Sequence, residues 1–219
     1  MTELHMHDII KNLSDGDIYT ISEIASLTNE PIEEVSRVIN DPTIPKTCGD
    51  GSGVIYIMDI KYDTIVDGIG FRNTVYCAKC NIHCTGCQNP QSHDIKNGKP
   101  ITISELAELL LENGNDITFS GGECSLQAKA FIKLAKIFKN NNRNIWLYSG
   151  YKFEQLISNH VSKDLLAYID VLVDGAFVEE LKNIDLLFRG SSNQRIIDVQ
   201  QSLSNGQVVL WDEHSYGIE

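Results

Sequence analysis

Basic side chains are scarce in this sequence, and long hydrophobic runs are absent. The 219 residues include 18 Lys and Arg against 30 Asp and Glu, which gives a formal net charge of -12. Broad binding to a nucleic-acid backbone needs a basic patch, so this balance argues against nucleic acid as a partner. No stretch approaches the roughly 18 consecutive apolar residues of a membrane helix, and we therefore expect no membrane association.

The marks of a targeting segment are also missing. The start, MTELHMHDIIKNLSDGD, has neither the basic residues and apolar run of a secretory signal nor the arginine-rich character of a transit peptide. We therefore expect a cytoplasmic protein. In that reducing compartment, clustered cysteines bind metals or carry out redox chemistry more often than they form disulfides.

Residues 1–50 differ in character from the rest of the chain. Thr20 and Glu23 form a capping box before an apolar face, and Pro31 suits the first turn of a second helix. The pattern resembles a helix-turn-helix, yet the segment holds ten acidic residues against three basic ones, a balance that repels DNA. We expect a small acidic helical module that docks on protein or packs on its own chain.

From residue 54 onward, predicted strands and helices alternate. Apolar runs predict strands at 54–60, 116–120, 144–149 and 170–175, and amphipathic segments predict helices at 101–113, 126–141 and 153–169. Such an order is typical of parallel strands joined by crossover helices. We therefore predict one α/β domain over residues 54–211, preceded by the helical module of residues 1–50.

Only six cysteines occur, and four of them lie in the spacing Cys77-x2-Cys80-x3-Cys84-x2-Cys87. Gly86 gives this short stretch the backbone freedom to bring several thiolates to one centre. Four cysteines could hold structural zinc, whereas the last three could hold three irons of a 4Fe-4S cluster and leave the fourth iron open. The spacing alone favours neither centre decisively.

Six blocks of the sequence, spread over roughly residues 54–205, resemble the radical S-adenosylmethionine (SAM) enzymes. More specifically, they resemble the family of proteins that activate anaerobic ribonucleotide reductase. The blocks are DGIGFR (67–72), CNIHCTGCQNP (80–90), GGEC (121–124), WLYSGY (146–151), DVLVDG (170–175) and FRGSSNQRIIDVQ (188–200).

The resemblance implies a fold, an activity and partners. The fold would be a partial (βα) radical SAM barrel. The activity would be that of an iron-sulfur oxidoreductase that cleaves SAM with a 4Fe-4S cluster and generates a glycyl radical. Its partners would be the large subunit of anaerobic ribonucleoside-triphosphate reductase and a low-potential electron donor such as flavodoxin.

The same resemblance assigns roles to single residues. Cys80, Cys84 and Cys87 match the cluster ligands and are the catalytic and metal-binding candidates. Glu123 would accept from the methionine ammonium of SAM, with the glycines before it allowing close backbone approach. The full set of implied SAM contacts is Gly86, Cys87, Gln88, Gly121, Gly122, Glu123, Ser149, Asp174 and Arg189.

Two cysteines depart from the family pattern. Cys77 occupies a usually aliphatic strand position, and Cys124 replaces a proline; we expect both to be small buried hydrophobic side chains. In the alternative, Cys77 is a fourth ligand that closes the site and favours zinc or an electron-transfer cluster. Two rival functions stay open: a small radical SAM enzyme of the deazaguanine-synthase type that acts on a metabolite, and a zinc-stabilised regulatory or interaction module. The identity of the metal would separate the last of these from both enzymes.

Overall fold

The computed structural model describes residue 31 and residues 53–212. The helical module predicted over residues 1–50 therefore falls outside the described residues, apart from Pro31. The rest of the chain, from Gly53 onward, forms a compact unit of its own.

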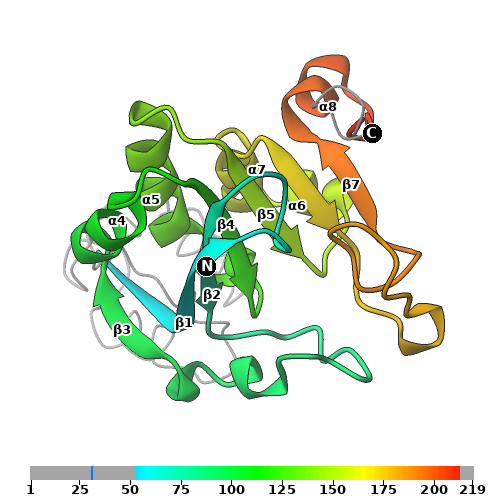
Figure 1. Ribbon diagram of the computed structural model, residues 1–219, viewed down its shortest axis with the longest axis horizontal. Helices are drawn as coiled ribbons and strands as arrows, with labels where there is room; N and C mark the ends of the chain where they lie inside the picture. Colours follow the sequence, from blue (N-terminus) through cyan, green and yellow to red (C-terminus); the bar gives the residue numbers. More distant parts are fainter. Residues whose placement is uncertain (1–30, 32–52, 213–219) are drawn as a thin grey trace. The chain divides into compact units, whose positions relative to one another are not determined.

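A seven-stranded sheet forms the centre of this unit (Figure 1). In spatial order the strands are β3 (Lys99–Thr102), β1 (Val54–Thr64), β2 (Arg72–Cys77), β4 (Asp116–Gly121), β5 (Ile145–Ser149), β6 (Val171–Asp174) and β7 (Arg195–Asp198). The strands β2, β4, β5 and β6 run parallel, while β1, β3 and β7 pair with their neighbours in the antiparallel sense. The sheet does not close, because β3 and β7 remain as its two edges.

Helices alternate with the parallel strands along the chain. The α-helices are α4 (Ile103–Leu111), α5 (Ala128–Asn140), α6 (Phe153–Ser158), α7 (His160–Leu166) and α8 (Val199–Asn205), and the short 3-10 helices are η1 (Pro90–His93), η2 (Ile95–Asn97), η3 (Cys124–Gln127) and η4 (Glu179–Leu181). The α/β prediction is confirmed at this level. Among the residues described, none of the helices has the length and apolar character to cross a membrane.

Two helix boundaries show how local side chains set the fold. Thr102 Oγ1 accepts a hydrogen bond from the Glu105 amide at 3.2 Å and caps α4. The single helix predicted over residues 153–169 is wrong, because an extended backbone at Asn159 separates α6 from α7. The Asn159 side chain instead caps α7 by accepting from the Ser162 amide at 3.0 Å. Capping has ended a helix that the hydrophobic pattern alone would continue.

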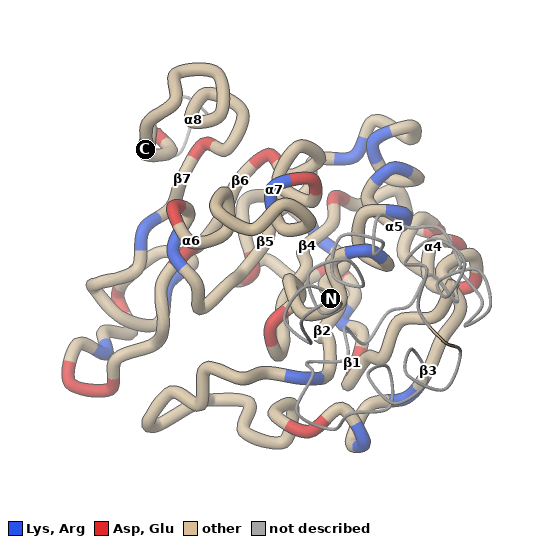
Figure 2. Tube along the Cα trace, turned by 180° about the vertical axis from the view of Figure 1, so that it is seen from behind, with Lys and Arg blue, Asp and Glu red and all other residues tan. Residues whose placement is uncertain are grey.

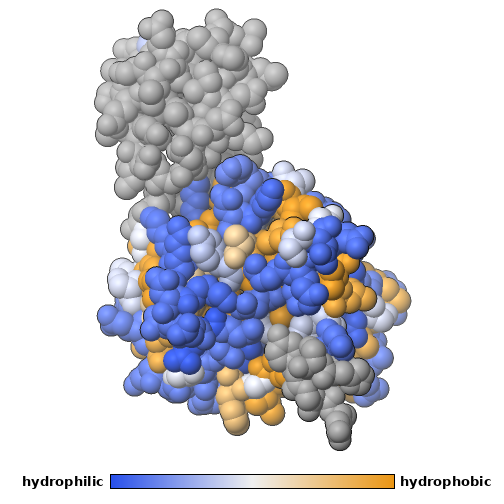
Figure 3. All heavy atoms as spheres, turned by 90° about the horizontal axis from the view of Figure 1, so that it is seen from above, coloured by the Kyte–Doolittle hydropathy of each residue, from blue (hydrophilic) through white to orange (hydrophobic). Residues whose placement is uncertain are grey.

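The hydrophobic core lies where α4 and α5 cover the sheet. Phe119 of β4 meets Phe131 of α5 with ring centroids 4.8 Å apart, and both side chains are fully buried. The surface carries the charge instead: lysines recur along α5, and glutamates lie on α4 (Figure 2). The face in Figure 3 is mainly hydrophilic, with smaller hydrophobic patches between. The sequence pattern of these helices is therefore explained by burial on the sheet.

Four chain segments meet at the carboxyl ends of the parallel strands, because such strands all end on the same side of the sheet. The cysteine loop, residues 78–89, follows β2, and the Gly-Gly-Glu turn, residues 121–123, follows β4. Ser149 ends β5 and Asp174 ends β6. Figure 1 shows the long segment after β2 passing below the ends of these strands. The fold thus gathers most of the predicted site residues at the carboxyl ends of the parallel strands.

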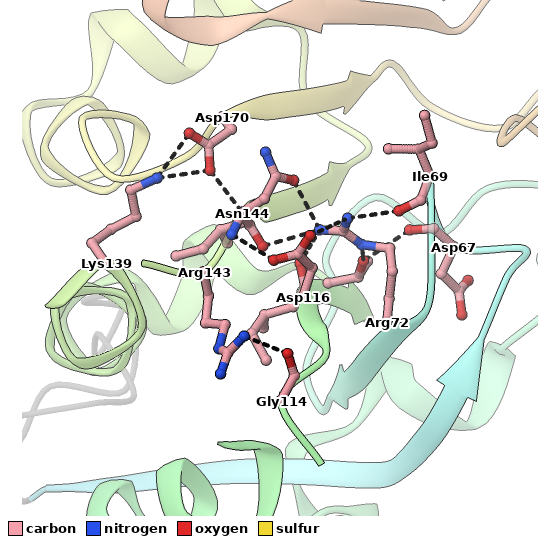
Figure 4. Close-up of polar contacts among 12 residues, drawn as sticks. Asp67, Ile69, Arg72, Gly114, Asp116, Lys139, Arg143, Asn144 and Asp170 are labelled. Atoms are coloured by element: carbon pink, nitrogen blue, oxygen red, sulfur yellow. Dashed lines mark hydrogen bonds and ion pairs between the residues drawn. The ribbon is translucent and has the colours of Figure 1, made fainter. Parts of the chain in front are cut away.

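At the amino ends of the parallel strands, Arg72 begins β2 and is fully buried (Figure 4). Its Nε donates to Thr118 Oγ1 at 2.7 Å, and its Nη2 donates to the carbonyl oxygens of Ile117 at 2.5 Å and Asn144 at 3.1 Å. The guanidinium carbon lies 5.4 Å from the centroid of the Trp146 ring. Burial lowers the pKa of Arg72 to about 10. This cation ties β2 to the beginnings of β4 and β5.

The DGIGFR block builds the turn in front of Arg72. Asp67 Oδ2 accepts hydrogen bonds from the hydroxyls of Thr74 at 3.0 Å and Tyr76 at 2.9 Å. Gly68 has a φ of 133°, and a Cβ there would lie 2.8 Å from Trp146 Cδ2. Only glycine fits such a backbone beside the indole ring. The block therefore has a structural explanation in the packing of β2.

Loss of the buried cation should cost much more stability than loss of a neighbouring arginine on the surface. We expect Arg72→Met to lower the free energy of unfolding by about 3 kcal/mol, because the buried carbonyl acceptors lose their donor. Arg143 donates to the carbonyl oxygen of Gly114 from a partly exposed position (Figure 4), and Arg143→Met should cost less than about 1 kcal/mol. Urea unfolding followed by tryptophan fluorescence measures both variants.

The probe suits this test because both tryptophans of the chain, Trp146 and Trp211, lie in the described unit with ring centroids 5.4 Å apart. Equal losses in the two variants would contradict the special role of Arg72.

Candidate metal and cofactor site

The cysteine loop contains neither helix nor strand after it leaves β2. Positive φ angles at Lys79 (76°) and Gly86 (70°) turn its backbone. Cys80, Cys84 and Cys87 are each partly exposed, and none is joined in a disulfide. The loop thus presents three free thiols over eight residues, as the sequence predicts.

Backbone amides donate to two of the three sulfur atoms of this loop. The Asn89 amide donates to Cys87 Sγ at 3.4 Å. Burial raises the pKa of the Cys80 thiol, and hydrogen bonds from the Ile82 and His83 amides act in the opposite direction. Amides that donate to sulfur stabilise thiolates and are among the features that tune iron-sulfur clusters.

The donor chemistry of the loop fits an iron-sulfur cluster, although the sulfur atoms are not gathered around one point. Over residue 31 and residues 53–212, no three Cys, His, Asp or Glu side chains converge closely enough to hold a metal ion. The three loop thiols are nevertheless free and partly exposed, and backbone amides donate to the sulfurs of Cys80 and Cys87, which suits the ligands of a cluster. Binding would require the loop to close around the cluster.

Cys77 is placed apart from these three thiols. It is the last residue of β2, has no exposed surface and belongs to the hydrophobic core. Its Sγ lies 3.2 Å from Sγ of Cys124, which is equally buried. Both cysteines therefore pack as the small hydrophobic side chains that we expect. A core position does not favour Cys77 as a fourth ligand.

Glu123 is a buried carboxylate with many donors around it. Its Oε1 accepts from the Ser125 hydroxyl at 2.6 Å and from the Ser149 hydroxyl at 3.0 Å. Its Oε2 accepts from Ser149 at 3.0 Å and from the Gly150 amide at 2.9 Å. Burial raises the pKa of Glu123, while these hydrogen bonds lower it. Two of the predicted SAM contacts, Glu123 and Ser149, are thus brought together.

The glycines before Glu123 are required by the fold itself. A Cβ on Gly121 would lie 2.5 Å from the Cys77 amide nitrogen, and one on Gly122 would meet the carbonyl oxygen of Lys79. The Gly122 amide donates to Cys77 O and the Glu123 amide donates to Lys79 O, both at 2.8 Å. No side chain fits in this space. The Gly-Gly-Glu turn is therefore joined to the stem of the cysteine loop by its backbone.

Asp174 forms an ion pair with Arg195. It is almost fully buried, and Arg195 Nε donates to its Oδ1 at 2.9 Å. The Phe153 amide donates to its Oδ2 at 2.7 Å. Arg195 also binds Glu154, whose pKa it lowers to about 2. The structure therefore gives this predicted SAM contact a role in joining β6, β7 and α6.

The remaining predicted contacts lie on the cysteine loop and on the long segment after β6. Arg189 Nη1 donates to Gln194 O at 3.2 Å, while its buried Nε has no hydrogen-bond partner among the described residues. Gln88 Nε2 lies 3.6 Å from the Cβ position of Gly190 on the same segment. The two segments thus lie side by side.

Sequence reasoning missed one residue at this contact. Glu179, in η4, places its carboxylate against Gly86, where a Cβ would lie 2.8 Å from the carboxylate carbon. Nothing near Glu179 in the sequence signals this position, because the contact joins segments that are more than ninety residues apart. Within the segment after β2, the imidazoles of His83 and His93 also meet, with their Nδ1 atoms 3.2 Å apart.

Comparison with known proteins identifies the family of this chain. The model of the 4Fe-4S single cluster domain family matches residues 66–197. An anaerobic ribonucleoside-triphosphate reductase-activating protein of Escherichia coli (strain K12) is 33% identical over 141 residues, which cover 59% of this chain and 90% of that protein.

Proteins of the same name are more distant but cover as much of the chain. The one from Haemophilus influenzae is 29% identical over 143 residues, covering 60% of this chain and 90% of the relative. The one from Enterobacteria phage T4 is 29% identical over 150 residues, covering 63% and 93%. The chain belongs to the family of anaerobic ribonucleoside-triphosphate reductase-activating proteins, within the 4Fe-4S single cluster domain family.

Proposed function

We propose that this protein is a radical SAM oxidoreductase that activates anaerobic ribonucleoside-triphosphate reductase by placing a glycyl radical on its large subunit. The open sheet of the described unit would be the partial barrel of such an enzyme. A bound 4Fe-4S cluster would supply the electron for the reductive cleavage of SAM, the chemistry from which the glycyl radical of the reductase would arise. A low-potential donor such as flavodoxin would supply that electron.

One observation carries this proposal: the Gly-Gly-Glu turn is hydrogen-bonded to the stem of the cysteine loop. The amides of Gly122 and Glu123 donate to the carbonyl oxygens of Cys77 and Lys79, both at 2.8 Å. The turn therefore has a fixed position relative to the loop that carries Cys80. A cofactor that must touch both a cluster and an acidic side chain would find them on adjoining strands.

Different residues would bind the cluster and SAM. Cys80, Cys84 and Cys87 would hold three irons and leave the fourth for SAM. Glu123 would accept from the methionine ammonium in place of one of its present donors, with Ser149 adjusting to the exchange. The protein's main task would be to orient these groups and exclude water from a reactive carbon radical.

Other contacts complete the proposed cofactor site. Gly86 and Gln88 flank Cys87 and would line the adenine side. Arg189, with its unpartnered buried Nε, would donate to a carboxylate or ribose oxygen. Asp174 would contribute indirectly, through the ion pair that fixes the end of β6.

Metal content tests the three-cysteine cluster. In protein purified without oxygen, we expect about four irons per chain and methionine release from SAM after reduction. Cys80→Ala should abolish SAM cleavage, because it removes one of three ligands, whereas Cys77→Ala should keep both iron and cleavage, because Cys77 lies in the core. Iron, sulfide and zinc analysis, together with product chromatography, measures this. Stoichiometric zinc without cleavage would support the zinc module instead.

A second variant tests the role of Glu123. Glu123→Gln keeps the shape but removes the charge that would bind the ammonium, so the KM for SAM should rise about 10- to 100-fold while iron content stays unchanged. Glu154→Gln is the matched control, because Glu154 is an exposed carboxylate paired with Arg195, and its KM should stay within about twofold of wild type. Steady-state kinetics of SAM cleavage gives both values. An unchanged KM in a folded Glu123→Gln variant would leave the carboxylate a structural role only.

We propose that the acidic module of residues 1–50 adjusts docking on the reductase. The unit that begins at Gly53 is compact by itself, so a chain without residues 1–50 should fold and keep its SAM cleavage. Its affinity for the reductase, measured by anaerobic titration, should change at least about threefold because the acidic surface is lost. Equal affinities for the full and shortened chains would rule this role out.

A further inference from the structure

Two buried cysteines outside the cysteine loop lie in contact with each other. Cys77 is the last residue of β2, and Cys124 is the first residue of η3, directly after the Gly-Gly-Glu turn. Both have no exposed surface, and their Sγ atoms are 3.2 Å apart. Cys124 Sγ also lies 3.4 Å from the carbonyl oxygen of Ser120. The proposed reaction uses neither sulfur.

The backbone holds these two sulfur atoms together. β2 and β4 are parallel neighbours, with Cys77 opposite Gly121, and the Gly122 amide donates to Cys77 O at 2.8 Å. The contact therefore does not depend on the conformation of the cysteine loop. A disulfide has a sulfur-sulfur distance of about 2.05 Å, so the atoms need to approach by only about 1 Å. Side-chain rotation can supply such a movement.

We propose that Cys77 and Cys124 form a buried dithiol that hydrogen peroxide oxidises reversibly to a disulfide. One thiol loses its proton and attacks the O–O bond of peroxide, which gives a sulfenic acid and, after the proton is taken up, one water. The sulfur of the second thiol then attacks the sulfenic sulfur and displaces the second water. Two thiols and one peroxide thus give one disulfide and two waters, a two-electron oxidation of sulfur.

Burial decides which oxidant can act and how fast. Neither sulfur has exposed surface, so a bulky disulfide such as oxidised glutathione has no path to them in the folded protein, whereas peroxide is little larger than water. Burial also raises the pKa of the Cys124 thiol, which makes the first step slow. Once formed, the sulfenic acid meets a thiol at contact distance, and this favours the disulfide over further oxidation.

The disulfide would join two parts of the site. Cys77 precedes Cys80 by three residues, and Cys124 follows Glu123 directly. A covalent bond between them would add to the two backbone hydrogen bonds that already join these segments. The stem of the cysteine loop and the Gly-Gly-Glu turn would then stay in register under oxidising conditions. This inference concerns the chain itself and does not rest on the proposed reaction.

Mass spectrometry of the full chain tests the dithiol. Protein purified without oxygen is treated with a few equivalents of peroxide, quenched with catalase, denatured in N-ethylmaleimide and digested. We expect a linked peptide pair that contains Cys77 and Cys124, is two hydrogen atoms lighter than the two thiol peptides, and disappears after dithiothreitol. The same treatment with oxidised glutathione should leave both cysteines alkylated by maleimide.

Variants give the matched controls. Cys124→Ala should abolish the link and leave Cys77 as a sulfenic acid that dimedone traps once the chain is denatured, and Cys77→Ala should do the converse. Recovery of both cysteines as maleimide adducts or sulfonic acids, while the loop cysteines have been oxidised, would overturn the proposal. A link from Cys77 to a loop cysteine would overturn it as well, and so would linking by glutathione as efficient as that by peroxide.

Discussion

The site depends on how closely two segments of backbone approach each other. Gly121 and Gly122 lie against the end of β2 and the start of the cysteine loop with no room for a Cβ atom. Two amides cross this contact and donate to Cys77 and Lys79. The approach fixes where the cysteine loop begins, where the Glu123 carboxylate lies, and which two cysteines of the core meet.

The two ends of the parallel strands are stabilised by buried groups of opposite sign. Arg72 lies where the strands begin, and Glu123 lies where they end. Arg72 donates to neutral oxygens and Glu123 accepts from neutral donors, and burial disfavours the charged form of both: the pKa of Arg72 is lowered and that of Glu123 is raised. At the amino ends, Arg72 joins β2, β4 and β5. At the carboxyl ends, Glu123 lies at the proposed cofactor site. The group that stabilises the sheet and the group proposed to bind the cofactor therefore lie at opposite ends of the same strands.

The sequence predicts what depends on local patterns and misses what depends on distant contacts. The alternation of strands and helices is confirmed, because residues a few positions apart determine it. The break at Asn159 was missed, because a capping side chain outweighed hydrophobic periodicity. The family membership is confirmed by the comparisons, whereas the SAM contacts stay predictions.

Contacts between distant segments leave no trace in a single sequence. Cys77 and Cys124 look like two unrelated departures from a motif until the register of β2 with β4 brings them together. Glu179 meets Gly86 for a similar reason.

The donors around the Glu123 carboxylate limit which ligand could bind there. In the proposed cofactor site, an amine would have to compete with Ser125, Ser149 and the Gly150 amide for the same oxygens, so a neutral analogue would offer no advantage over the donors already there. The occupied carboxylate would therefore act as a filter that admits a cationic group and rejects its uncharged isostere.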